Sequence, residues 1–79
     1  MVELFRIFND ENFVKYEYVN DGIKEKSGII VLNKKTKEVI FERKAQNGKS
    51  LTFRGRTKYR LLKYAEENSY PEEDYISIY

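Results

Sequence analysis

The chain has 79 residues with no cysteine and no histidine, and its 15 basic and 13 acidic side chains leave a net charge of +2. These absences exclude disulfides and remove the usual thiolate nucleophile, the usual general base and the commonest zinc ligands. No apolar stretch approaches the length of a membrane span, and no secretory pattern opens the chain. We therefore expect one domain over residues 1–79, cytoplasmic and without membrane contact.

The first half of the chain is typical of two strand pairs. Residues 2–8 and 13–19 are rich in β-branched and aromatic side chains, and a short polar turn separates them. Residues 28–32 (GIIVL) and a strand from 39 to about 44 follow as a second predicted hairpin. In the turn between them, Lys37 is expected in a left-handed conformation that glycine would adopt at lower cost.

One segment is typical of a helix, Phe53 to Glu67. Its apolar side is formed by residues at helical spacing: Leu61, Leu62 and Ala65. Asn68 is the expected C-terminal cap residue, since Pro71 bars continuation soon after. The start has two interpretations: Gly55 permits a tight entry or a close approach to a strand, or Thr57 is the N-cap.

A last strand is predicted at residues 75–79 (YISIY), which gives the order β-β-β-β-α-β. The predicted fold class is α+β, an antiparallel sheet of about four to five strands with a single helix packed on one face. Four aromatic residues are predicted to lie in the core or at its edge: Phe5, Phe13, Tyr18 and Phe41. The other sheet face also carries apolar side chains, so it is either partly exposed or covered by another chain, a homodimer being one alternative.

No combination of residues indicates catalysis. None of the four serines has a recognisable activating partner, and the run Gly48-Lys49-Ser50 lacks the upstream glycine of a phosphate-binding loop. The carboxylates gather as adjacent groups, which is typical of solvated turns, and none of the groups is dense enough for a calcium site. We expect no enzymatic activity, no metal and no cofactor.

The charges are distributed in blocks along the chain. Residues 1–33 carry four basic and six acidic groups, residues 34–63 carry eleven basic and two, and residues 64–79 carry five acidic groups and no basic one. The net charges of the blocks are therefore −2, +9 and −5. Such a layout creates a positive surface despite the small total, unless the acidic segment folds back over the basic one.

The basic side of the predicted helix is the candidate binding surface. The predicted binding residues are Arg54, Arg56, Tyr59, Arg60 and Lys63. Their charges suit an acidic surface of a protein partner, with Tyr59 as an aromatic anchor. Direct DNA or RNA binding is the alternative, because the same groups neutralise phosphates and stack on bases. An ordinary solvated helix face is the third interpretation.

Several segments resemble small proteins encoded by phages and mobile elements of Firmicutes. These are VLNKKTKEVIFERKAQN, the FRG that opens the helix, and KYAEENSYPEEDYISIY, within a loose similarity over residues 13–79. The chain departs from the pattern where Lys37 replaces a usual Gly and Arg56 a frequent His, so no role of that His carries over. The resemblance implies a mobile-element accessory protein that binds a host protein or a ribonucleoprotein, including defence complexes that target nucleic acids.

Overall fold

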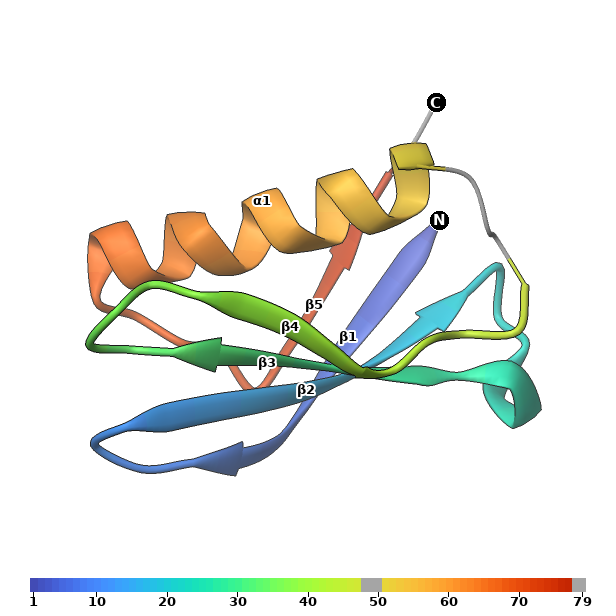
Figure 1. Ribbon diagram of the computed structural model, residues 1–79. Coiled ribbons are helices and arrows are strands. Elements are labelled where there is room, and N and C mark those ends of the chain that lie inside the picture. The colour runs from blue at the N-terminus through green and yellow to red at the C-terminus, as the bar shows by residue number, and fades with distance from the viewer. Residues whose placement is uncertain (48–50, 78–79) are drawn as a thin grey trace.

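The computed structural model describes residues 1–47 and 51–77, and it consists of one antiparallel sheet and one helix (Figure 1). The elements are β1 (Val2–Asn9), β2 (Phe13–Asn20), a 3-10 turn η1 (Lys24–Lys26), β3 (Gly28–Asn33), β4 (Val39–Arg43), α1 (Leu51–Glu67) and β5 (Glu73–Ile76). The five strands are ordered β4-β3-β2-β1-β5. The predicted α+β class with a single helix is confirmed.

The last strand lies earlier than predicted. It covers Glu73–Ile76 instead of 75–79, of which residues 78–79 lie outside the described residues. Pairing with β1 determines its position, since Leu4 lies opposite Asp74 and the Arg6 N–H donates to the Glu72 carbonyl at 2.9 Å. The alternating pattern at the end of the sequence carries no information on this long-range register.

The turn between β3 and β4 is closed by a bulge at Lys37. The Lys37 N–H donates to the Asn33 carbonyl at 2.8 Å, and the Asn33 N–H donates to the Glu38 carbonyl at 2.8 Å. Lys37 and Glu38 thus both lie opposite Asn33. Lys37 has φ 65°, the left-handed conformation that glycine usually adopts in such a bulge. The predicted left-handed conformation of Lys37 is confirmed.

Replacing Lys37 with glycine should stabilise the fold by about 0.5–1 kcal/mol, because relief of the left-handed strain outweighs the added freedom of the unfolded chain. Urea denaturation followed by circular dichroism measures the change. Lys35→Gly is the matched control in the same turn, and it should be neutral or destabilising because φ is not positive there. Equal effects of the two substitutions would contradict strain at Lys37.

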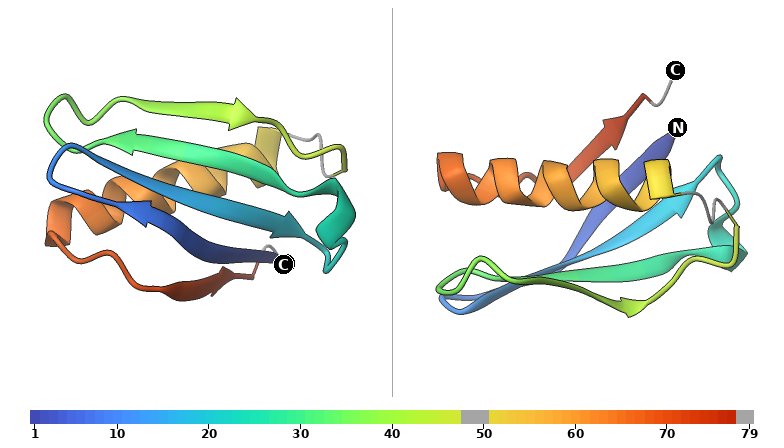
Figure 2. Two further views of the ribbon diagram at one scale, coloured as in Figure 1. Left: turned by 90° about the horizontal axis from the view of Figure 1, so that it is seen from below. Right: turned by 45° about the horizontal axis from the view of Figure 1, so that its top comes forward.

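The helix packs across one face of the sheet (Figure 2, right). Among its described side chains Thr57, Leu61 and Tyr64 are buried, and Leu61 and Tyr64 pack with the core residues of the strands. Thr57 lies inside the helix and donates its hydroxyl to the Phe53 carbonyl at 2.8 Å, so the N-cap interpretation is wrong. Gly55 is also an interior helix residue with nothing within 4 Å of its Cβ position, so neither a tight entry nor a close approach explains it.

The opposite sheet face is not covered by the helix (Figure 2, left). Phe8, Phe13 and Ile40 are 45%, 41% and 54% exposed there, so the prediction of Phe13 as a core residue is wrong. Tyr18 is buried and Phe41 packs against the core, as predicted.

No helix within the described residues is both long enough and apolar enough to span a membrane.

Candidate functional site

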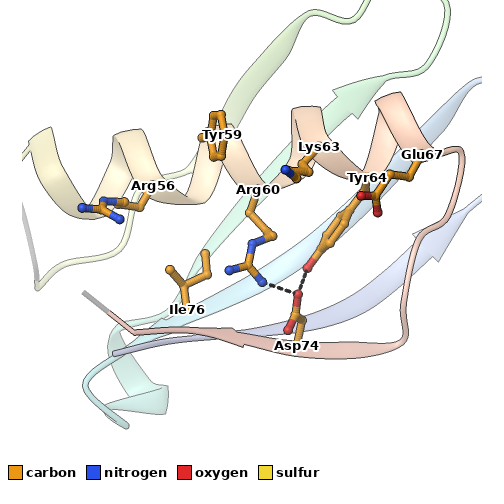
Figure 3. A pocket seen from close by; sticks show the side chains of 8 residues that line it. All are labelled: Arg56, Tyr59, Arg60, Lys63, Tyr64, Glu67, Asp74 and Ile76. Atoms are coloured by element: carbon orange, nitrogen blue, oxygen red, sulfur yellow. Dashed lines mark hydrogen bonds and ion pairs between the residues drawn. The ribbon is translucent and has the colours of Figure 1, made fainter. Parts of the chain in front are cut away.

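A groove of about 410 Å³ runs between α1 and the edge strand β5 (Figure 3). We call it the α1–β5 groove, and its lining residues are Arg56, Tyr59, Arg60, Lys63, Tyr64, Glu67, Asp74 and Ile76. Four of the five predicted binding residues gather here. They recur at three- and four-residue spacing along α1, which places them on one flank of the helix.

Arg54 does not line this groove. It lies two residues before Arg56, which rotates it by about 200° around the helix axis. Its side chain is half-buried on the other flank, close enough to Tyr18 for its charge to act on that hydroxyl. Burial raises the pKa of Tyr18, and the positive charge of Arg54 opposes this rise. The predicted set of five is therefore one cluster of four plus a separate cation.

Asp74 connects β5 to the helix at the floor of the groove. Its Oδ2 accepts a hydrogen bond from the Arg60 guanidinium at 2.6 Å and another from the Tyr64 hydroxyl (Figure 3). Its Oδ1 accepts the Tyr75 N–H at 2.8 Å. The acidic segment thus folds back on the basic helix through this carboxylate, and Arg60 has an internal ionic partner.

The network determines how Asp74 titrates. Burial opposes ionisation, but hydrogen bonds from Tyr64 and Arg60 and the Arg60 charge hold the pKa of Asp74 below its ordinary value of 3.8. Burial, with the Asp74 carboxylate beside it, raises the pKa of Tyr64, so its hydroxyl remains protonated and donates. The groove floor is therefore an ionised carboxylate held by three donors, the Arg60 guanidinium, the Tyr64 hydroxyl and the Tyr75 N–H.

Asp74→Asn should reduce the amount of folding stability that the protein loses at acidic pH. A pKa lowered in the folded state contributes stability above about pH 4 that is lost as the pH falls through the folded value. The wild-type chain should therefore lose more stability than the variant when denaturation midpoints are compared between about pH 6 and about pH 2. Asp10, whose pKa is lowered by the N–H groups of Phe13 and Asn12, accounts for part of the remaining dependence. Identical pH profiles would contradict the role of Asp74.

Two cations of the groove have no ionic partner among the described residues. Arg56 and Lys63 are exposed and make no hydrogen bond or ion pair with any described residue. Tyr59, 63% exposed, lies near both on the same helix (Figure 3). Three cations and two carboxylates line the groove, so its net charge is only +1.

The sequence did not indicate all lining residues. Asp74 belongs to an acidic run that is typical of a solvated turn, and Tyr64 lies at the margin of the apolar helix side that Leu61, Leu62 and Ala65 form. The burial of Tyr64 follows from helical periodicity, but its contact with Asp74 requires the pairing of β5 with β1. In the described part of the chain, no three His, Cys, Asp or Glu side chains converge as a metal site would require.

A scan against protein-family models finds no match, and searches of curated proteins and of solved structures likewise find none.

Proposed function

We propose that the protein is a non-enzymatic binding protein that uses the α1–β5 groove to bind an acidic surface of a protein partner. The observation that carries this proposal is the exposed Tyr59 beside two cations, Arg56 and Lys63, that no described residue engages. An exposed aromatic ring and arginine are typical of residues that dominate binding energy at protein interfaces. Arg60 contributes shape and charge while Asp74 holds it in place.

The groove favours a protein over a nucleic acid. Glu67 and Asp74 line it beside the cations and leave a net charge of only +1, which is little against the continuous charge of a phosphate backbone. An acidic protein surface can instead place single carboxylates against Arg56 and Lys63. The resemblance to proteins of phages and mobile elements supports a host protein or ribonucleoprotein as the partner, with inhibition of a nucleic-acid-targeting defence complex as the biological role. The chemistry of the groove supports contact with the protein part of such a complex.

The test uses a charge-reversal variant and a matched control. Arg56→Glu/Lys63→Glu reverses the two free cations, and Lys26→Glu/Lys35→Glu makes the same charge change at exposed residues away from the groove. We expect the wild-type chain and the control variant to capture the same partner from a Firmicutes lysate. The groove variant should not capture it. With the purified partner, calorimetry should show a Kd at least about tenfold higher for the groove variant.

A titration with single-stranded and duplex oligonucleotides separates the two partner classes. Binding that weakens steeply with salt and is lost in the groove variant would favour nucleic acid as the ligand. Groove and control variants that capture the same partner with equal affinity would overturn the proposed site.

A further inference from the structure

Three charged side chains of the α1–β5 groove lie along one line of the helix (Figure 3). At about 100° per residue, Arg56, Lys63 and Glu67 fall within about 40° of one another around the axis of α1. All three are exposed, and no ion pair joins them to any described residue. Along the axis, Lys63 lies about 10.5 Å and Glu67 about 16.5 Å beyond Arg56. The helix thus presents two positive charges and then a negative one over about three turns.

The two sides of this line differ in what they offer to a partner. Tyr59 lies about 60° to one side, and its ring is 63% exposed. Arg60 lies about 40° to the other side, where Asp74 holds its guanidinium at 2.6 Å. An apolar side chain of a partner would therefore pack against Tyr59. The complementary element carries, in order along α1, an acidic, an apolar, an acidic and a basic side chain.

The spacing of these positions fits an α-helix better than a strand. In a helix, residues i, i+7 and i+11 lie on one face at about 10.5 and 16.5 Å, the separations found from Arg56 to Lys63 and to Glu67. In a strand, residues on one face recur every ~6.7 Å, at about 6.7, 13.4 and 20 Å, and miss both separations by about 3 Å. A helix seated beside α1 at the usual 8–10 Å between axes would face all of these side chains at once.

The β5 side of the groove does not favour the addition of an acidic strand. The pairing of Arg6 with Glu72 directs the Tyr75 N–H away from β1, and the Asp74 carboxylate accepts this N–H at 2.8 Å. The strand has only four residues, and its Glu73 and Asp74 would repel acidic side chains placed opposite them. Short strands and satisfied donors protect a sheet edge from pairing.

We propose, on the basis of the function proposed above, that the acidic surface bound by the α1–β5 groove is an amphipathic α-helix that lies along α1. Its contact residues follow one another at spacings of three, four and four, as Arg56, Tyr59, Lys63 and Glu67 do. The two acidic residues pair with Arg56 and Lys63, and the apolar residue packs on Tyr59. The basic residue opposite Glu67 adds specificity, because an acidic residue there would be repelled.

Fluorescence anisotropy with synthetic peptides and the full chain tests the proposal. The probe is a labelled peptide, stapled as a helix on its far face, that presents Glu, Leu, Glu and Lys at these spacings. A second probe carries the same pattern in reverse order, because two helices can pack parallel or antiparallel. One control peptide has the same composition with the four residues spread around the helix, and another is unstapled with two prolines. We expect one probe to bind with a Kd at least about tenfold lower than either control.

Protein variants locate the bound helix. Arg56→Glu/Lys63→Glu should raise the Kd of the better probe at least about tenfold, and Lys26→Glu/Lys35→Glu should leave it unchanged. Glu67→Lys should weaken binding of the Lys-bearing probe and strengthen binding of a version with Glu at that position. A Glu67→Lys variant with no such reversal overturns the proposed alignment.

Two outcomes would overturn the helix as the bound element. One is equal binding of probes and controls that the groove variant abolishes, which leaves the acidic protein surface as the partner. The other is a lack of binding of both probes up to about 1 mM. Capture of a partner from the lysate by the wild-type chain, and its loss in the groove variant, tests the proposed function separately.

Discussion

Leu61→Ala should lower the free energy of unfolding by about 2–5 kcal/mol. Leu61 is fully buried where α1 meets the sheet, so truncation removes apolar contact and leaves a cavity that the strands cannot fill. Domains are stabilised by only about 5–15 kcal/mol in total, and a chain of 79 residues buries a smaller fraction of its unfolded surface than a larger domain does. The substitution should therefore leave a substantial unfolded population near body temperature.

Leu62→Ala is the matched control for this substitution. The two leucines are neighbours in the sequence, but Leu62 is only half-buried and packs at the rim of the core. We expect the free energy of unfolding to fall by about 1 kcal/mol or less, because truncating a half-buried side chain removes little buried apolar area. Urea denaturation followed by circular dichroism gives both values. Similar losses for the two variants would mean that the helix does not pack through Leu61.

Gly28→Ala should destabilise the protein by about 1–3 kcal/mol or more. An added Cβ at Gly28 would lie 2.3 Å from Cζ and 2.4 Å from Cε1 of Tyr18, which faces it across the β2–β3 ladder. The ring has little freedom to move away. Its hydroxyl accepts the Ala45 N–H at 2.8 Å, and Phe41 packs against it edge-on with ring centroids 5.6 Å apart.

Gly55→Ala makes the same chemical change with the opposite expected sign. Nothing lies within 4 Å of its Cβ position on the exposed side of α1, so the added methyl meets no obstacle. Alanine in a helix interior is more stable than glycine by about 0.5–1 kcal/mol, and we expect a gain of that size. Thermal denaturation of both variants is the measurement. A neutral Gly28→Ala would show that the Tyr18 ring can leave its position.

Local sequence patterns predicted most of the secondary structure because each depends on neighbours in the chain. Runs rich in β-branched and aromatic residues marked β1 to β4, and the three-and-four spacing around Leu61 marked α1. The left-handed residues also followed from local chemistry: Lys37 has φ 65°, and Asn68, the expected cap residue, has φ 51°. These features require no knowledge of which strands pair.

The site was only partly predictable, because its composition depends on long-range pairing. Helical spacing brings Arg56, Tyr59 and Lys63 to one flank, but a count of charges along the sequence also included Arg54, which the helix carries to the other flank. The partner of Arg60 could not be predicted. Asp74 reaches it only because β5 lies beside β1, and no local pattern encodes that choice of neighbour.

The pairing of β1 with β5 also sets the order in which the protein can fold. Val2 lies opposite Ile76, so this contact closes a loop through almost the whole described chain, whereas the other strand pairs join sequence neighbours. Contacts of long sequence separation form late because loop-closure entropy must be overcome first. We expect the four-strand meander to form before β5 docks. A chain caught at that stage would have most of its sheet but no groove, so binding competence would be the last property acquired during folding.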